Sequence, residues 1–388
     1  MKESKFKYPY KVLHAPTSVG GNSQGLSEGL NKNGVYSRTV CLQNNYFNYP
    51  SDFILWSDSD GLFIREIKRL FLLIKTLFTY KVIHYNFGTT IASPTFYLRG
   101  GDSLLREIFR RIYYRYLDFL QLFELIVFNI SGKILFITYQ GDDARQGDFL
   151  KANFEINIAK QVDQNYYTEI SDIWKRNSIA RISRYCHKIY AVNPDLLNVL
   201  PSTAKFIGYT NIKLQDWPYT APEIDEKIPL KIIHAPSHRD VKGTKYVEST
   251  IKRLRSEGYH FELILVEGVS NQEARELYKK GDIFIDQLFA GWYGGVAVEA
   301  MALGKPVMAY IRESDLRFIP NEMRDDLPVI SVTAETLYFK LRRILEQPRS
   351  QLIDLSRRSR FYVEKWHDPV LIAKTIQADY ESFFLGKR

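Results

Sequence analysis

The chain has 388 residues, 45% of them hydrophobic and 25% charged, a globular composition that is long enough for two domains of ordinary size. The net charge of +9 favours an anionic partner, which is nucleic acid, anionic lipid or a phosphorylated substrate. We expect neither a secretory signal nor a membrane span, because the first ten residues are polar and basic and no apolar run reaches about 18 residues; Cys41 and Cys186 form no motif, which indicates a reducing compartment without disulfides.

Short apolar runs alternate with helical patterns along the whole chain. This alternation predicts an α/β protein in which parallel sheets are covered by helices on both faces. We expect strands at residues 11–14, 81–85, 134–139, 188–192, 230–234, 261–266, 283–286, 307–310 and 329–332.

A glycine pair follows the first predicted strand. Gly20 and Gly21 precede a predicted helix over residues 23–32, which ends near Gly34. Doubly wound folds bind ligands at the C-terminal edge of such strands, so we expect these glycines to lie against a ligand. The spacing is not that of a dinucleotide fingerprint, and a tight strand-to-helix turn without a ligand is the alternative.

Two predicted helices, residues 62–78 and 104–128, combine basic residues at helical spacing with apolar ones. Such a face suits an anionic membrane surface. The alternative is an ordinary helix face in contact with water. The basic residues are Arg65, Lys68, Arg69 and Lys75 in the first helix and Arg106, Arg110, Arg111 and Arg115 in the second.

The strand at residues 134–139 runs into Gln140-Gly-Asp-Asp-Ala-Arg145. Paired carboxylates just beyond a strand end, here Asp142 and Asp143, can bind hydroxyl groups or transfer a proton. The alternative is an Asp-rich turn in which Asp143 caps a helix.

Residues 208–229 are rich in turn formers and are predicted to be a linker. Lys-Val-Leu-His-Ala-Pro-Thr-Ser at residues 11–18 reappears on the other side of the linker as Lys-Ile-Ile-His-Ala-Pro-Ser-His at 231–238. The repeat indicates the first strands of two Rossmann-like halves, with chance similarity as the alternative. We therefore expect a first domain over residues 1–207, a second over 230–367, and a helical segment over 368–388 that crosses back to the first.

The loop after the second of these strands carries Arg239 and Lys242, close to a predicted helix start at Gly243-Thr244. An arginine can bind two phosphate oxygens at once, and a lysine adds a mobile point charge. Together they suit a diphosphate. Two surface cations in water are the alternative.

The most informative stretch is Gly-Trp-Tyr-Gly-Gly-Val-Ala-Val-Glu-Ala-Met-Ala-Leu-Gly-Lys-Pro-Val at residues 291–307. It predicts a glycine loop and a short helix between two strands. Gly294 and Gly295 let backbone amides near Val296 approach a ligand, and the helix N-terminus favours an anion. Glu299, about one turn on, is an acceptor for hydroxyls. Phosphate and hydroxyls together describe a nucleotide or a nucleotide-sugar.

These motifs resemble those of bacterial glycosyltransferases of the GT-B fold, family 4 (group 1). The resemblance covers most of the chain and is strongest over residues 230–310. It implies two Rossmann-like doubly wound parallel-sheet domains that face a central cleft, with the donor on the second domain and the acceptor on the first. It also implies transfer from a nucleotide-diphosphate sugar to a saccharide acceptor, with retention, and without a metal or a cofactor.

The resemblance assigns roles to individual residues. Arg239 and Lys242 would hold the donor diphosphate, Glu299 would accept hydrogen bonds from ribose hydroxyls, and Asp142 would face the acceptor or the transferred sugar. The implied catalytic residues are Asp142, Arg239 and Lys242. The implied donor-binding residues are Gly20, Gly21, Arg239, Lys242, Gly294, Gly295, Val296 and Glu299, and the implied acceptor-binding residues are Asn22, Asp143 and Arg145.

Position 291 departs from the family pattern. The family usually has a second glutamate eight positions before the one that Glu299 matches, and here that position is Gly291. Because this carboxylate normally contacts the donor sugar, Gly291 implies either an unusual donor or lost activity. Asp286 is a candidate replacement.

The basic, aromatic first half suggests an acceptor on a polyprenyl diphosphate lipid, as in bacterial capsule, O-antigen or exopolysaccharide assembly. We expect a cytoplasmic protein, peripheral on an anionic membrane surface at the cytoplasmic face of the inner membrane. The alternatives are a catalytically inactive GT-B partner subunit and a GT-B epimerase or phosphorylase. We expect no nucleic-acid partner, because the sequence lacks any recognised binding module.

Overall fold

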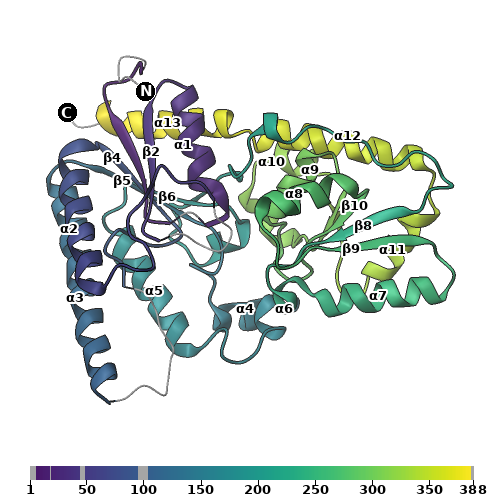
Figure 1. Ribbon diagram of the computed structural model, residues 1–388, viewed down its shortest axis with the longest axis horizontal. Helices are drawn as coiled ribbons and strands as arrows, with labels where there is room; N and C mark the ends of the chain where they lie inside the picture. The colour runs from purple at the N-terminus through teal and green to yellow at the C-terminus, as the bar shows by residue number, and fades with distance from the viewer. Residues whose placement is uncertain (1–5, 18, 44–48, 95–103, 386–388) are drawn as a thin grey trace.

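The computed structural model describes residues 6–17, 19–43, 49–94 and 104–385, and it contains two parallel sheets with helices on both faces (Figure 1). The expected α/β architecture is therefore confirmed. The first sheet has the strand order β3-β2-β1-β4-β5-β6-β7. Its strands are β1 (Lys11–Ala15), β2 (Tyr36–Cys41), β3 (Phe53–Ile54), β4 (Val82–Asn86), β5 (Ile134–Tyr139), β6 (Lys188–Ala191) and β7 (Lys205–Phe206).

Helices cover both faces of the first sheet. On one face Val12, Val82 and Phe136 pack with residues of α1, and on the other Leu13, Ile83 and their neighbours pack with residues of α2, α3 and α5. Because both faces are covered, the central strands are continuous apolar runs rather than alternating ones. The helices of this half are α1 (Asn22–Lys32), α2 (Leu62–Thr79), α3 (Leu104–Ile130), α4 (Gly147–Asn153) and α5 (Glu169–Ser183).

The second sheet has the order β12-β11-β10-β8-β9 and a core on each face. Helices α7 and α11 cover one face, and α8, α9 and α12 cover the other. The strands are β8 (Leu230–His234), β9 (Phe261–Leu265), β10 (Ile283–Ile285), β11 (Val307–Ala309) and β12 (Ile330–Ser331). The helices are α6 (Arg239–Lys242), α7 (Thr244–Ser256), α8 (Asn271–Lys280), α9 (Gly295–Ala302), α10 (Asn321–Asp325), α11 (Leu337–Glu346) and α12 (Arg349–Trp366).

Helix α13 (Pro369–Leu385) runs from the second half back over the first sheet (Figure 1). The hydroxyl of Tyr380 lies 2.6 Å from Nδ1 of the buried His84 on β4, and the Tyr190 hydroxyl on β6 donates to Asp379 at 2.5 Å. Apolar residues of α13, such as Ile376, complete the core between α1 and the sheet. The domain limits drawn from the sequence stay a prediction.

The predicted strands agree with the observed ones to within one residue at each end. Strands β2, β3 and β7 were not predicted. In β2, Ser37 and Thr39 interrupt the apolar pattern although both are buried, and each finds a polar partner: Ser27 donates to Ser37, and Asp52 accepts from Thr39. Across the described ranges, no helix has both the length and the apolarity needed to cross a membrane.

Candidate active site

Lys242 forms a buried ion pair beside the start of α9. It is the last residue of the short helix α6, and its Nζ donates to Asp286 Oδ1 at 2.6 Å and to Gln287 Oε1 at 2.9 Å. The other carboxylate oxygen of Asp286 accepts from the backbone amide of Gly294 at 2.6 Å. A side chain at Gly294 would begin 3.1 Å from Lys242 Nζ. The glycine therefore allows the ion pair of Lys242 and Asp286 to lie against the N-terminus of α9.

Glu299 lies one turn into the same helix and is buried. Burial raises its pKa to about 7, although the positive charge of Arg275 opposes the shift. Asn211 Nδ2, from the segment between the two sheets, is 3.4 Å from Glu299 Oε1 and donates to the carbonyl of Gly295 at 3.1 Å. Glu299 is therefore poised between its neutral and ionised forms near neutral pH.

The glycine loop of the first half approaches this site through Tyr49. Gly20 and Gly21 both have left-handed backbones, with φ of 62° and 73°, and a side chain at Gly21 would begin 2.9 Å from the Tyr49 ring. Asn271 Nδ2, at the start of α8, lies 3.5 Å from the Tyr49 hydroxyl. Burial, followed by the nearby Glu299, raises the pKa of Tyr49. The two halves therefore meet between Gly20 and Gly21 of the first half and Glu299 of the second, which are all predicted donor-binding residues.

Asp142 is held by two consecutive tyrosines. The hydroxyl of Tyr166 donates to Oδ2 at 2.6 Å, that of Tyr167 donates to Oδ1, and Arg145 Nη1 lies 3.7 Å away. Burial raises the pKa of Asp142, but Arg145 and the tyrosine hydroxyls outweigh this effect and hold the pKa below its ordinary value. The Tyr166 ring packs edge-on against His238 of the second half, with ring centroids 5.3 Å apart. Asp142 therefore presents an ionised carboxylate close to the junction of the halves.

Three of the predicted acceptor residues are engaged within the protein. Asp143 accepts hydrogen bonds from the backbone amides of Gln140 and Gly141, so it stabilises the turn, as the alternative interpretation expects. These amides belong to its own loop and not to a helix, so Asp143 is not a helix cap. Arg145 makes a buried double contact with Asp195, at 2.7 and 3.3 Å. Asn22 donates to the side chain of Gln140 and accepts from the Thr210 amide. Their contacts hold the site together rather than leaving their polar groups open.

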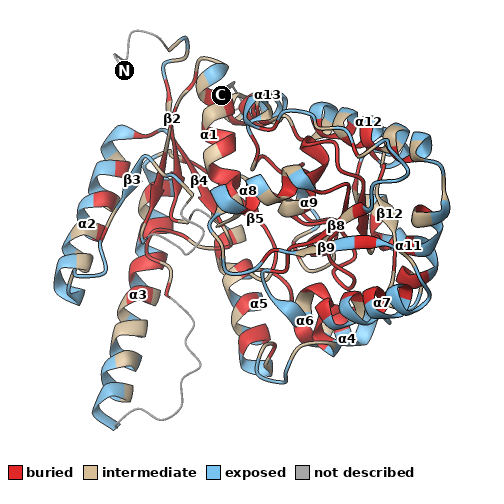
Figure 2. Cartoon of the chain, turned by 45° about the vertical axis from the view of Figure 1, so that its right-hand side comes forward, coloured by how far each residue is buried: buried red, intermediate tan, exposed pale blue. Residues whose placement is uncertain are grey.

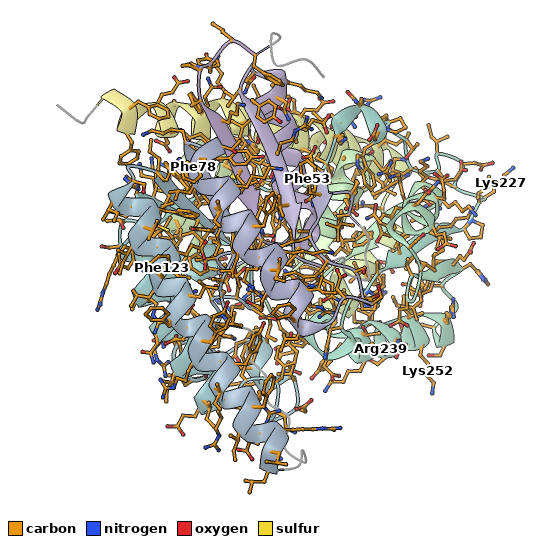
Figure 3. All side chains as sticks on the ribbon, turned by 60° about the vertical axis from the view of Figure 1, so that its left-hand side comes forward. Phe53, Phe78, Phe123, Lys227, Arg239 and Lys252 are labelled. Atoms are coloured by element: carbon orange, nitrogen blue, oxygen red, sulfur yellow. The ribbon has the colours of Figure 1, made fainter. Side chains whose placement is uncertain are left out.

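Arg239 lies apart from Lys242, although both belong to α6. Its guanidinium is exposed and pairs with Glu267 at 2.7 Å and with Glu248 (Figure 3). The structure therefore brings Lys242, Gly294, Gly295, Val296 and Glu299 together along α9, and it leaves Arg239 on the outer side of its helix.

Gly291 leaves no room for the glutamate that the family pattern has there. Its φ is +82°, and a side chain would begin 2.6 Å from Nη1 of Arg312. Arg312 is itself buried, pairs with Asp315 at 2.8 Å, donates to the carbonyl of Ile156 at 3.1 Å and stacks on Phe154. Both oxygens of Asp286, the candidate replacement, accept hydrogen bonds within the protein, from Lys242 and from the amide of Gly294.

Several residues of the site were not found from the sequence. Tyr166 and Tyr167 meet Asp142, and His238 meets Tyr166, only through tertiary contacts, and Asn211 lies in the predicted linker. The adjacent tyrosines in a polar stretch are the one signal that could have indicated a site.

Comparisons with family models and with curated proteins give no match. Solved structures do match over nearly the whole chain. Sucrose-phosphate synthase from Thermosynechococcus elongatus has a TM-score of 0.58 and 15% identity, covering 96% of this chain and 98% of that one. HepE from Anabaena, in complex with UDP-glucose, has a TM-score of 0.58 and 11% identity, covering 96% and 100%. The catalytic domain of starch synthase IV from Arabidopsis thaliana, bound to ADP and acarbose, has a TM-score of 0.56 and 11% identity, covering 96% and 99%. These structures are GT-B glycosyltransferases, and the chain has the GT-B fold.

Proposed function

We propose that this protein is a glycosyltransferase that moves a sugar from a nucleoside-diphosphate sugar to a saccharide acceptor, with retention of anomeric configuration. One observation carries the proposal: the buried Lys242 lies at the start of α9, and Glu299 lies one turn further along that helix. A cation and a helix N-terminus suit the diphosphate, and the carboxylate suits the ribose hydroxyls. Two of the similar structures hold UDP-glucose or ADP, which supports the same assignment.

The charge that develops during transfer falls on the departing diphosphate. The bond between the sugar C1 and the diphosphate oxygen breaks, a bond from C1 to an acceptor hydroxyl oxygen forms, and the proton of that hydroxyl passes to the departing diphosphate oxygen. Lys242 and the amides at the start of α9 would stabilise the departing group, which is the interaction that most lowers such barriers. Because these positive groups are built into the fold, we propose transfer without a metal or a cofactor, and activity should persist in a chelator.

Asp142 is the residue proposed to face the acceptor or the transferred sugar. Its pKa is held below the ordinary value, so it is ionised at neutral pH and can accept a hydrogen bond from a sugar hydroxyl. We further propose that the acceptor is carried on a polyprenyl diphosphate lipid, in the assembly of a bacterial surface polysaccharide at the cytoplasmic face of the membrane. The apolar and basic edge of the first half, described below, supports this part.

A thermal-shift screen against UDP-, GDP-, ADP- and dTDP-sugars, with a CMP-sugar as the monophosphate control, tests the donor class. A ligand that binds only the native state raises the unfolding temperature by mass action, so one nucleotide series should stand out. A protein that none of the four series stabilises would contradict the proposal. Hydrolysis or transfer of the selected donor then distinguishes an enzyme from a binding protein.

A catalytically inactive partner subunit is the second candidate. It is favoured by Gly291, which lacks the donor-sugar carboxylate of the family pattern and where a side chain would begin 2.6 Å from Nη1 of Arg312. Donor binding in the thermal-shift assay, without transfer or hydrolysis over a panel of saccharide acceptors, would select this candidate.

A further inference from the structure

Helix α2 turns most of its apolar side chains away from the protein, and only Leu72, Leu73 and Leu77 of its described apolar residues pack against the core of the first sheet. Its buried residues are Arg69, Leu72 and Thr76. Arg69 lies under the helix, where it donates to the carbonyl of Ile91 at 2.8 Å and stands over the ring of Trp56. The outer side of the helix carries a row of exposed apolar side chains at helical spacing: Leu62, Phe63, Ile64, Ile67, Leu70, Phe71, Ile74 and Phe78.

Helix α3 lies beside α2 and repeats this arrangement (Figures 1 and 2). The two are joined where Tyr113 donates to Glu66 at 2.5 Å. The inward side of α3 includes the buried Gln121 and Glu124, and Glu124 accepts from the Tyr85 hydroxyl and from two backbone amides. Its exposed apolar side chains are Leu104, Leu105, Ile108, Phe109, Ile112, Phe119, Leu122, Phe123, Ile126 and Ile130.

Together these side chains form a continuous apolar surface, which we call the α2–α3 face. Figure 3 shows Phe78 of α2 and Phe123 of α3 on the same side of the molecule, with Phe53 of the edge strand nearby. Phe63, Phe78 and Leu105 are each more than three-quarters exposed. An apolar surface of this extent marks a docking site, because burying it from water is strongly favourable.

Arginines and aromatic side chains border the α2–α3 face. Between α3 and α5 lies a cavity of about 760 Å³, whose walls include Arg110, Arg111, Arg115, Tyr114 and Trp174. Arg111 pairs with Glu107 at 2.5 Å, and its side chain is still 78% exposed. Apolar side chains bordered by arginine, tyrosine and tryptophan match the layering of a bilayer, with its hydrocarbon, its interface and its anionic headgroups.

We propose that the α2–α3 face inserts into the interfacial region of an anionic lipid bilayer, with the arginines of α3 at the level of the headgroups. The inference deepens the proposed function, on which it rests for the lipid-linked acceptor. A second copy of the chain would match the apolar side chains but would bring the arginines of α3 close to those of its partner. A bilayer with acidic headgroups complements both the apolar row and the charge.

Vesicle co-sedimentation tests the proposal with the full chain. Wild type should bind vesicles made of equal parts phosphatidylcholine and phosphatidylglycerol, and it should bind phosphatidylcholine alone more weakly. The double variant Phe63→Gln/Phe78→Gln should lower the partition coefficient about a hundredfold, because burying each phenylalanine corresponds to about tenfold or more. The matched control is Phe339→Gln/Phe361→Gln, at positions 65% and 57% exposed on α11 and α12, and it should bind as wild type does.

Donor thermal shift on the same three proteins separates this inference from the proposed reaction. Loss of vesicle binding with an unchanged donor shift supports docking through the α2–α3 face. Three outcomes would each overturn the inference. Wild type could fail to bind anionic vesicles, the double variant could bind them as wild type does, or wild type could form a stable dimer that is absent in the double variant. Vesicle binding by a protein that no donor stabilises would overturn the proposed reaction and leave the docking surface in place.

Discussion

Helices α7 and α2 are both amphipathic, and they face the protein in opposite senses. Helix α7 buries Val247, Ile251 and Leu254 against the second sheet and exposes its charged residues. Helix α2 buries Arg69 together with Leu72 and Thr76, and it exposes Phe63, Phe71 and Phe78. The difference teaches that helical periodicity serves two arrangements here: α7 encloses its apolar stripe, while α2 leaves a large apolar stripe exposed, the surface that we propose for docking.

The largest effect should distinguish the two helices by stability. Leu254→Ala should lower the free energy of unfolding by about 2–5 kcal/mol, because it leaves a cavity in a closed core. Phe71→Ala, at a position 65% exposed, should change it by about 0.5 kcal/mol or less. Urea denaturation without lipid measures both. Equal losses would mean that α2 is packed in solution and that the contrast between the helices is wrong.

The second effect concerns the charges gathered in the second half. Lys242→Ala should lower the turnover number by about 10²–10³-fold, as for the loss of one group that stabilises developing charge. Arg239→Ala, three residues earlier on the same helix, should cost much less because Arg239 pairs with surface carboxylates. Steady-state kinetics with the donor identified by thermal shift measure both. An equal loss of turnover in the two variants would show that Arg239 breaks its ion pairs with Glu248 and Glu267 and binds the diphosphate.

The third effect is a pH dependence that Glu299 should bring to the second half. Its folded-state pKa of about 7 lies above its ordinary value of 4.5, so its contribution to stability is full below pH 4.5 and is lost as the pH rises to 7. Glu299→Gln should remove this loss, which is about 3 kcal/mol at 1.36 kcal/mol per pKa unit. Denaturation of both proteins across this pH range measures the difference. Parallel curves would show that Glu299 ionises at its ordinary pKa.

The smallest effect should sharpen the picture of the first half. Arg111→Gln/Arg115→Gln should weaken binding to anionic vesicles by about 1 kcal/mol for each residue and should leave binding to neutral vesicles unchanged. Co-sedimentation at low and high salt measures this. A variant that weakens binding to both kinds of vesicle equally would place the two arginines outside the headgroup region.

Strands that lie in the middle of a sheet were predictable, because burial on both faces requires an uninterrupted apolar run. Strands β5 and β8 have the predicted bounds at both ends. Strand β2 was not predictable, because Ser37 and Thr39 are buried through hydrogen bonds that only the folded chain supplies. The orientation of α2 was hidden for a different reason: periodicity gives the direction of an apolar stripe around a helix and does not say whether that stripe faces the core or the surroundings.

The residues of the candidate site that belong to local motifs could be proposed from the sequence. Lys242, Glu299 and the glycines beside them lie in loop-to-helix turns, where spacing along the chain determines spacing in the fold. The tyrosines that hold Asp142 come from a separate segment with no motif, and so does Asn211. The ion pairs that hold Arg239 and Arg145 depend on partners at sequence separations of 28 and 50 residues, respectively, which spacing alone does not reveal.

Helix α13 has a consequence for the order in which the molecule forms. It completes the core over Val12, Val82 and Phe136, yet about 240 residues separate Phe136 from Ile376, which belongs to the same core. During synthesis the first sheet must therefore wait, with this face covered only in part by α1, until the whole second half has left the ribosome. Contacts of such long range slow folding. A nascent chain of the first half alone would expose that face together with the α2–α3 face, and a nearby bilayer or a chaperone would be the first surface available to cover them.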